Sequence, residues 1–383
     1  MATQFPIERF ANLDTPFYYY DLQLLHTTLD TIVSEASRHD FVVHYAVKAN
    51  ANSRILTEVR NAGLGIDCVS GNEVRAALEH GFDSKKIVYA GVGKSDREIN
   101  LALDADIECF NVESIPEMEV INHLAGLKGK VANIALRINP NVDAHTHQYI
   151  TTGMEENKFG IGLWEVDTAA LKAKELSNIN LIGLHFHIGS QITDMAAFQA
   201  LCTRINEIQR RFEEQHYRLS IINVGGGLGI DYEHPDEVSI PDFPAYFAVF
   251  AKHLELRNGQ KVHFELGRSV VAQCGSLISR VLYVKKGQKK QFAIIDAGMN
   301  DLIRPALYHA YHKIENISSK LPTEKYDVVG PVCESSDCFG KEISIASAKR
   351  GDLIALRSAG AYGEIMASRY NLRPFAPAYF SEQ

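Results

Sequence analysis

The chain has 383 residues, of which 46% are hydrophobic and 22% are charged, a composition typical of globular proteins and long enough for two domains. Its formal net charge is −8 and the acidic residues are spread along the sequence, so no basic surface for nucleic acid or for an anionic membrane is expected. No apolar run approaches the roughly 18 residues of a transmembrane helix, no signal peptide is recognised, and the six cysteines are scattered as in reduced, cytoplasmic proteins.

The first predicted elements are strands and helices in alternation. Residues 17–21 form a strand-like opening, and from residue 41 to about 266 short β-rich runs are each followed by a stretch with apolar residues three and four positions apart. Apolar strands alternating with amphipathic helices indicate a parallel sheet, and eight such units predict a (β/α)₈ TIM-like barrel, with a doubly wound sheet as the alternative. The eight runs are Val42–Val47, Gly65–Val69, Ile87–Ala90, Ile107–Val112, Ile134–Ile138, Ile182–Ile188, Ile221–Val224 and Val262–Leu266.

Beyond residue 267 strand-like runs follow one another with few helical patterns, which predicts a mostly antiparallel β domain. The expected organisation of this α/β chain is a barrel domain over residues 25–266 and a β domain over residues 267–383, joined by the N-terminal strand within residues 1–24. The long polar segment 139–163, between the fifth and sixth barrel strands, is expected to be a substrate lid. The runs are Leu277–Val284, Gln291–Asp296, Tyr326–Val329, Glu342–Ala346 and Leu353–Arg357.

A lysine stands at the end of the first predicted barrel strand, in the run His44–Asn50. Burying an ammonium group is costly unless it is paired or chemically used, and a lysine with a lowered pKa forms imines with carbonyl compounds. Asp67, His187 and Glu265 also fall at the carboxyl ends of predicted strands, where barrel enzymes hold their catalytic residues. The pattern therefore indicates an active site at this end, although Lys48 alone could extend to solvent and His187 could be a hydrogen-bonded core residue.

The run Gly225-Gly226-Gly227 follows the seventh predicted strand. Glycines let backbone N–H groups approach an anion, and the loops after strands seven and eight of such barrels commonly bind phosphate, although the run could also be a simple turn. A lysine that binds an aldehyde, together with a phosphate loop, predicts pyridoxal 5′-phosphate (PLP) as the cofactor. Glu265 is the candidate partner of the pyridine nitrogen, and His187 is the candidate to stack on the ring.

Two other interpretations stay open. Glu265 could be the buried ion-pair partner of Arg268. His185 and His187 lie two positions apart on one strand face and could bind a metal ion, but no carboxylate or cysteine lies nearby at ligand spacing, so no metal is expected.

With these residues placed, the chain resembles the alanine-racemase-like (fold type III) PLP-dependent decarboxylases, and among them the diaminopimelate decarboxylase family. The resemblance runs from about Thr15 to Phe380 and implies that Ser190, Gly267 and Arg268 also contribute to cofactor binding. The motifs that carry it are His44–Asn50, Gly65-Ile66-Asp67-Cys68 with Glu73, His187-Ile188-Gly189-Ser190-Gln191, the triple glycine, and Glu265-Leu266-Gly267-Arg268, in which Leu266 replaces the usual proline.

Motifs in the second half of the chain extend the resemblance. In the family they contribute to a site shared across a homodimer, so Cys333 and Glu334 are expected to reach the cofactor of the neighbouring subunit. Tyr362 is expected near the cofactor phosphate and the substrate. Cys333 could instead be a small buried residue, Arg304 with the following proline could only shape a turn, and Tyr308 and Tyr362 could be interface aromatics. The motifs are Asp296–Asp301, Arg304–Tyr308, Gly330–Asp337 and Ala359–Gly363.

The resemblance implies a carboxy-lyase that converts meso-2,6-diaminopimelate to L-lysine and CO₂, the last step of lysine biosynthesis. The distal carboxylate of this substrate calls for guanidinium groups, for which Arg268 and Arg304 are the candidates. Tyr308 and Tyr362 are expected beside them, with Glu334 at the distal ammonium.

Lys48, Cys333 and His187 are the expected catalytic residues, and either Lys48 or Cys333 could return a proton to the substrate α-carbon. Three alternatives stay open. The chain could decarboxylate carboxynorspermidine, ornithine or arginine, it could racemise an amino acid, or it could be a PLP-binding regulatory protein without turnover.

Overall fold

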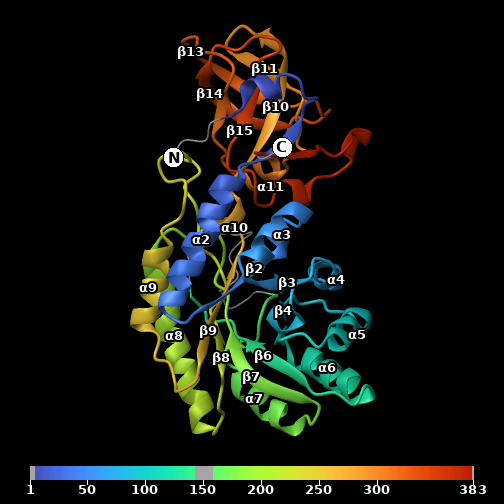
Figure 1. Cartoon of the computed structure of the whole chain (residues 1–383), viewed down its shortest axis with the longest axis vertical. Coiled ribbons are helices and arrows are strands. Elements are labelled where there is room, and N and C mark those ends of the chain that lie inside the picture. The colour runs from blue at the N-terminus through green and yellow to red at the C-terminus, as the bar shows by residue number, and fades with distance from the viewer. Residues whose placement is uncertain (1–4, 143–157, 382–383) are drawn as a thin grey trace. The chain divides into compact units, whose positions relative to one another are not determined.

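The structure is a computed structural model that describes residues 5–142 and 158–381. These residues divide into two compact units, each described here by itself (Figure 1). The barrel unit consists of Leu29–Gly229 and Asp242–Gly267, and the β unit consists of residues 5–28, Ile230–Pro241 and residues 268–381. The segment Ile230–Pro241 therefore belongs with the β unit, whereas its sequence position had placed it within the barrel range 25–266.

The barrel unit is a closed ring of eight parallel strands with helices around it, which confirms the predicted (β/α)₈ fold and excludes the doubly wound sheet (Figure 1). Strand β9 closes the ring by pairing with β2, so that Val42 lies opposite His263 and His44 lies opposite Glu265. The strands are β2 (Val42–Ala46), β3 (Gly65–Cys68), β4 (Ile87–Tyr89), β5 (Cys109–Val112), β6 (Ala132–Arg137), β7 (Ile179–His185), β8 (Ile221–Asn223) and β9 (Lys261–Leu266).

The helices of this unit begin at side chains that accept hydrogen bonds from the first-turn N–H groups, such as Ser70 before α4 and Ser114 before α6. Their apolar faces pack on the strands, as where Phe250 of α9 meets Phe264 of β9 edge to face at 5.0 Å between ring centroids. The helices are α2 (Leu22–Arg38), α3 (Ser53–Asn61), α4 (Gly71–Glu79), α5 (Asp96–Ala105), α6 (Ile115–Leu127), α7 (Val166–Glu175), α8 (Met195–Glu214) and α9 (Phe243–His253), with short 3₁₀ turns η1 (Val47–Ala49) and η2 (Ser84–Lys86).

The β unit is an eight-stranded sheet in which most neighbours are antiparallel, as predicted. The predicted N-terminal strand, β1, lies in this sheet between β10 and β16. Phe17 and Tyr19 of β1 pack in an apolar core with Ile278 and Leu353. The strands are β1 (Phe17–Tyr20), β10 (Gly275–Lys286), β11 (Gln291–Ile295), β12 (Ile314–Asn316), β13 (Thr323–Val329), β14 (Cys338–Ala346), β15 (Leu353–Leu356) and β16 (Ala378–Phe380), and the helical turns are α1 (Ile7–Phe10), α10 (Arg268–Val271), α11 (Arg304–Tyr308), η3 (Glu364–Met366) and η4 (Tyr370–Leu372).

Two predicted positions need correction. Lys48 does not end a strand, because β2 stops at Ala46 and Lys48 lies in the 3₁₀ turn η1 that follows. His187 likewise lies beyond β7, whose last residue is His185. The strands β12 and β16 were not predicted, since three residues are too few to show an alternating pattern.

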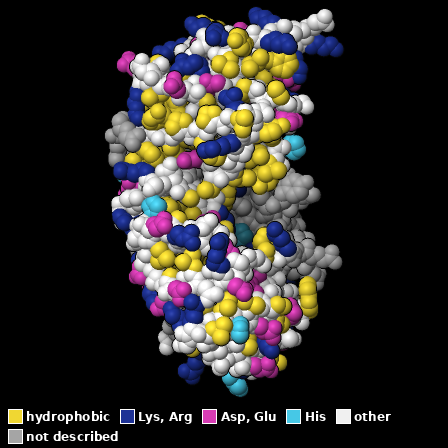
Figure 2. All heavy atoms as spheres, turned by 90° about the vertical axis from the view of Figure 1, so that its right-hand side faces the viewer, with side chains coloured by type: hydrophobic (Ala, Val, Ile, Leu, Met, Phe, Trp, Pro, Cys, Tyr) yellow, Lys and Arg dark blue, Asp and Glu magenta, His cyan; other side chains and the backbone are white. Residues whose placement is uncertain are grey.

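None of the helices in the described ranges combines the length and the apolar character needed to cross a membrane. Lysine and arginine side chains are interspersed with aspartate and glutamate over the face of the molecule in Figure 2.

Candidate active site

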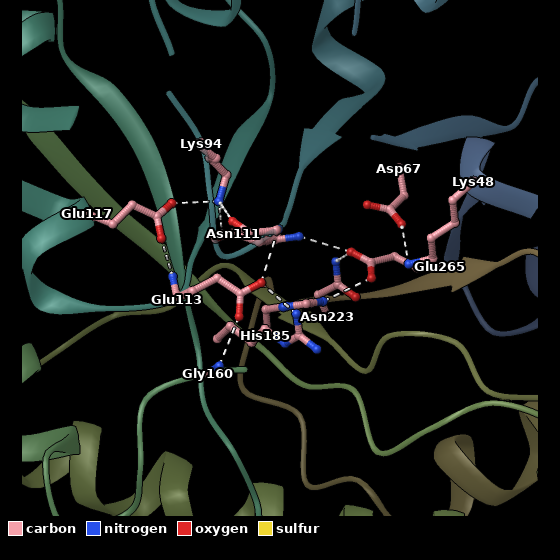
Figure 3. A network of polar contacts seen from close by, with 12 residues as sticks. Lys48, Asp67, Lys94, Asn111, Glu113, Glu117, Gly160, His185, Asn223 and Glu265 are labelled. Atoms are coloured by element: carbon pink, nitrogen blue, oxygen red, sulfur yellow. Dashed lines mark hydrogen bonds and ion pairs between the residues drawn. The ribbon is translucent and has the colours of Figure 1, made fainter. Parts of the chain in front are cut away.

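The barrel holds a lysine–aspartate pair just beyond β2 and on β3. Lys48 Nζ lies 3.7 Å from Asp67 Oδ2, and the Asp67 side chain is fully buried whereas that of Lys48 is 39% exposed (Figure 3). Neither carboxylate oxygen of Asp67 has a hydrogen-bond partner among the described residues. Burial raises the pKa of Asp67 well above its ordinary value, and the nearby charge of Glu265 raises it further. This buried carboxyl group therefore has unused hydrogen-bonding capacity beside the only predicted imine-forming lysine.

A second buried carboxylate, Glu265 at the end of β9, is surrounded by hydrogen-bond donors. Asn111 Nδ2 and Asn223 Nδ2 donate to Glu265 Oε1 over 3.0 and 2.8 Å, and His185 Nε2 lies 2.9 Å from Oε2 (Figure 3). Burial alone would raise the pKa of Glu265, but His185, Lys48 and two amide donors favour its ionised form, and the pKa is lowered below its ordinary value.

The geometry around Glu265 bears on one of the open interpretations. The partners found for Glu265 are barrel residues, so the interpretation of Glu265 as a simple ion-pair partner of Arg268 is replaced by this network. His185 is one of those partners, through its Nε2. Three donors leave a carboxylate, which has about four acceptor positions, with room for one more.

His187 lies beyond β7 next to the triple glycine. The Gly226 N–H donates to His187 Nδ1 over 3.3 Å, so the neutral ring carries its proton on Nε2. Burial and the positive charges of Lys48 and Arg137 lower the pKa of His187 well below its ordinary value. His187 is therefore a neutral aromatic ring.

The triple glycine after β8 adopts a conformation that side chains would not permit. Gly225 and Gly227 have φ values of +71° and +112°. A Cβ on Gly226 would collide with the carbonyl oxygen of Glu265. The Ile192 N–H donates to the Gly227 carbonyl over 2.9 Å, which ties this loop to the one that contains half-buried Ser190. The two predicted phosphate-loop segments thus lie side by side.

Sequence reasoning missed a set of buried ion pairs beside the Glu265 network. Glu113 accepts from Arg137 Nη1 over 2.6 Å with one carboxylate oxygen and from the Gly160 N–H over 2.9 Å with the other (Figure 3). Lys94 Nζ lies 2.6 Å from Glu117 Oε1 and also donates to the Asn111 carbonyl. These pairs fix the segments from which Asn111 and its neighbours project.

The β unit holds a separate cluster of arginines and tyrosines. Arg268 Nη1 donates to Tyr232 Oη over 2.6 Å, and Arg304 Nη2 lies 3.4 Å from the same oxygen. Both arginines are more than nine-tenths buried. The Arg268 guanidinium lies over the Tyr362 ring at 5.0 Å, and the Arg304 guanidinium lies 6.0 Å from the Tyr308 ring. The structure therefore brings together four residues that the resemblance had named for substrate binding, and adds Tyr232.

Arg304 has no carboxylate of the described residues within ion-pair distance. Its Nε lies 3.3 Å from His312 Nε2, and His312 Nδ1 lies 2.9 Å from the Arg357 carbonyl, so His312 accepts from Arg304. Burial and Arg304 lower the pKa of His312 to about 3, which keeps the imidazole neutral. By contrast, the buried Arg357 is paired with Asp236 at 2.7 Å and with Glu315 at 2.6 Å. A buried cation without a counter-charge is costly unless a ligand supplies one.

Cys333 and Glu334 lie on an exposed segment between β13 and β14. The Tyr370 hydroxyl donates to Glu334 Oε1 over 2.6 Å, and the Cys333 N–H lies 3.4 Å from Asn371 Oδ1. The interpretation of Cys333 as a small buried residue is wrong, since this cysteine is exposed.

The predicted barrel residues fit PLP in one specific respect. Asp67 is buried with unsatisfied oxygens beside Lys48, and this pairing suits a polar ligand that reaches the lysine. Gly267 directly follows β9 and is buried. Of the predicted lid 139–163, residues 143–157 lie outside the described residues, so the lid stays a prediction.

Asn111, Asn223 and His185 were not predicted as partners of Glu265. Each is a polar residue inside or at the end of an otherwise apolar strand run, and that is the signal that could have identified them. Tyr232 and His312 lie outside every motif considered, so sequence alone offered no signal for them.

Comparisons with known proteins cover the whole chain. Residues 26–272 match the family model for the pyridoxal binding domain of pyridoxal-dependent decarboxylases. A diaminopimelate decarboxylase from Bacteroides thetaiotaomicron is 62% identical over 99% of this chain and 98% of its own length. The crystal structure of the Helicobacter pylori diaminopimelate decarboxylase complexed with L-lysine has a TM-score of 0.92 at 40% identity, covering 98% of this chain and 93% of that one. The crystal structure of the diaminopimelate decarboxylase from M. jannaschii in co-complex with L-lysine has a TM-score of 0.90 at 35% identity, covering 98% of this chain and 89% of that one.

Proposed function

The chain belongs to the pyridoxal-dependent decarboxylase family, in its diaminopimelate decarboxylase branch, and on this premise we propose how its residues share the conversion of meso-diaminopimelate to L-lysine and CO₂. PLP, when bound, supplies an electron sink for the electrons that the departing CO₂ leaves behind. Lys48 would hold the cofactor through its aldehyde, with Asp67 Oδ2 3.7 Å from Lys48 Nζ.

Glu265 is the proposed partner of the pyridine nitrogen. Its low pKa keeps it ionised, so it stabilises a positive charge next to its remaining acceptor position. Asn111, Asn223 and His185 hold the carboxylate in one orientation. His187, a neutral ring, would stack on the cofactor. The segments with Ser190 and with Gly225–Gly227 would bind its phosphate, together with Gly267, Arg268 and Tyr362.

Arg304 is the proposed binding group for the distal carboxylate of the substrate. It is buried without a carboxylate partner among the described residues, and its fork of donors matches a carboxylate in two hydrogen bonds. Arg268, Tyr308 and Tyr362 complete this part of the site, and Glu334 binds the distal ammonium. Lys48 Nζ or Cys333 Sγ returns the proton to the α-carbon.

The proposal also includes a homodimer and a cytoplasmic location. Exposed Cys333 and Glu334 are available to a second subunit, and the C-terminal segment beside them exposes apolar side chains, with Leu372 94% and Phe375 51% exposed. Mixing Lys48→Ala chains with Cys333→Ala chains tests this arrangement. Activity that returns on mixing supports shared sites, and two variants that stay inactive together would oppose them.

The observation that carries the function is the pair formed by Lys48 and the unsatisfied Asp67. The test is to incubate the chain with PLP and meso-diaminopimelate and to measure L-lysine and CO₂. Borohydride reduction followed by peptide mapping should place the pyridoxyl label on Lys48, and a label elsewhere would contradict the assignment.

A panel of amino acids in the same assay separates the alternatives. Carboxynorspermidine, ornithine and arginine have no distal carboxylate placed as in diaminopimelate, so Arg304 could not bind them in the same way and we expect little CO₂ from them. A PLP-loaded chain that releases CO₂ from none of these substrates would instead be a binding protein without turnover.

A further inference from the structure

The opposite, N-terminal end of the barrel holds a buried cluster that the proposed function does not use. It consists of His44 on β2, His263 on β9 and Glu108, which directly precedes β5. His44 is 0% and His263 3% exposed. His263 lies two positions before Glu265 and shares its strand face, so the histidine pair forms the layer of the barrel below the Glu265 network. Two strands and the residue just before a third strand thus each contribute one chelating side chain.

The hydrogen bonds of the pair define its protonation. His44 Nδ1 lies 3.3 Å from the Lys86 carbonyl and donates to it, which leaves a lone pair on Nε2. His263 Nδ1 lies 3.0 Å from that nitrogen and must be the donor. Ligand histidines in metal sites typically donate their other ring N–H to a backbone carbonyl or a carboxylate, as His44 does here. Burial lowers the pKa of His44 to about 4, so its ring is neutral.

Glu108 adds an unsatisfied carboxylate oxygen. Glu108 Oε2 lies 3.8 Å from His44 Nε2, is itself buried, and has no hydrogen-bond partner among the described residues. The side chain is 23% exposed, so a path to solvent exists on one side. A cavity of about 280 Å³ adjoins the cluster and is lined by His44, Lys86 and Glu108 together with residues of α2. The Lys86 ammonium is held away, since it donates to the Gly63 carbonyl.

These distances suit a transition metal ion. Zn²⁺ binds histidine nitrogen and carboxylate oxygen at about 2.0–2.2 Å, so tetrahedral ligand atoms lie roughly 3.3 Å apart. The observed separations of 3.0 and 3.8 Å bracket that value, and all three ligand atoms lie within 4.8 Å of one another. Two histidines and one glutamate are a common zinc ligand set that leaves a fourth position for water, and here the cavity can hold it.

We propose that His44, His263 and Glu108 form a binding site for one divalent transition metal ion at the N-terminal end of the barrel. The metal replaces the proton that His263 shares with His44, and that proton moves to Nε2 of His263 or to solvent. The bound ion links β2, β9 and the start of β5. The expectation that the chain binds no metal rested only on His185 and His187.

The test uses the full-length, PLP-loaded chain carrying Cys333→Ser, because the exposed thiol would itself bind soft metals. Co²⁺ is the probe, followed by its visible absorption and displaced by Zn²⁺. We expect one Co²⁺ per chain, and Glu108→Gln should weaken binding by at least about 100-fold, since even second-shell losses cost 10- to 100-fold. Asp231→Asn is the matched control. Asp231 pairs with the exposed His234 at 3.1 Å, outside the proposed site, so loss of its carboxylate should leave Co²⁺ affinity unchanged.

Two results would overturn the proposal: a Co²⁺ affinity of the Glu108→Gln chain equal to that of its parent, or no Co²⁺ binding by the parent chain. In either case His44 and His263 would be only a hydrogen-bonded pair. A second measurement needs no variant. In the chain labelled with ¹⁵N-histidine, Zn²⁺ should shift one ring nitrogen of each of two histidines, and an unchanged spectrum at saturating Zn²⁺ would equally oppose the site. Loss of activity is not the readout, so failure of this site leaves the proposed decarboxylation untouched.

Discussion

The carboxylate at the end of the barrel and the arginine of the β unit are both buried, but only the carboxylate is satisfied by the protein. Glu265 accepts from three side chains of the barrel. Arg304 has a neutral histidine and a tyrosine as partners and no carboxylate among the described residues. The fold therefore satisfies the charge that we propose serves the cofactor, and leaves without a counter-charge the one that we propose serves the substrate. Substitutions at the first should damage turnover, and substitutions at the second should damage substrate binding.

The largest effect is expected from Lys48→Ala. Without the amino group the cofactor has no covalent attachment and one candidate proton donor is lost, so kcat should fall by about 10²- to 10⁴-fold. Steady-state assays with meso-diaminopimelate measure this loss. The matched control is Lys94→Met, which removes a buried lysine paired with Glu117, and should keep the borohydride-reducible label.

Glu265→Gln tests the buried carboxylate, whose hydrogen-bond partners are supplied by the barrel. The amide keeps the shape but loses the negative charge, so kcat should fall by about 10²-fold, as on loss of a single preorganised electrostatic partner, with KM little changed. A variant that raises KM instead of lowering kcat would break the division between the two clusters.

Arg304→Lys tests the buried arginine that has no carboxylate partner among the described residues. A lysine keeps the charge and loses the paired hydrogen bonds, which costs roughly 1.5–3 kcal/mol, or about 10- to 100-fold in KM for meso-diaminopimelate. Arg357→Lys is the control, since Arg357 is equally buried but paired with Asp236 and Glu315. It should lower the free energy of unfolding and leave KM unchanged.

The smallest effects on turnover are expected from the pH dependence of stability, to which Glu265 and Asp301 should contribute with opposite sign. The pKa of Glu265 is lowered, so its contribution is present above its unfolded pKa of about 4.3 and is lost as pH falls. Burial raises the pKa of Asp301 in the β unit to about 6. The contribution of Asp301 to the free energy of unfolding is fully present below its unfolded pKa of about 3.9. It is lost as pH rises through 6, which lowers the free energy of unfolding by up to about 3 kcal/mol.

Urea unfolding between pH 4 and pH 7 measures that dependence. Asp301→Asn should remove the decrease in stability between pH 4 and pH 6, and Glu265→Gln should not. Identical pH profiles for wild type and Asp301→Asn would show that the aspartate titrates normally.

The sequence predicted the barrel well because each of its strands is a buried apolar run and each helix has a regular apolar face. The positions of Lys48, Asp67 and Glu265 followed from the rule that parallel strands end at one edge. Their hydrogen-bond partners did not follow, because Asn111, Asn223 and His185 meet Glu265 only after the ring closes. The arginine cluster was predicted from resemblance alone, since irregular β segments carry no periodic signal that places side chains.

The strand β1 has a consequence for how the protein is made. It pairs with β10 and, through Tyr18, Tyr19 and Tyr20, with the last strand β16. Strand β1 thus lacks one of its two neighbours until residues 378–380 have been synthesised. All eight barrel strands precede β16 in the chain, so the barrel can form first, and the sheet of the β unit is completed only once β16 has been synthesised. A chain truncated before residue 378 should therefore fold its barrel and leave β1 without its β16 partner.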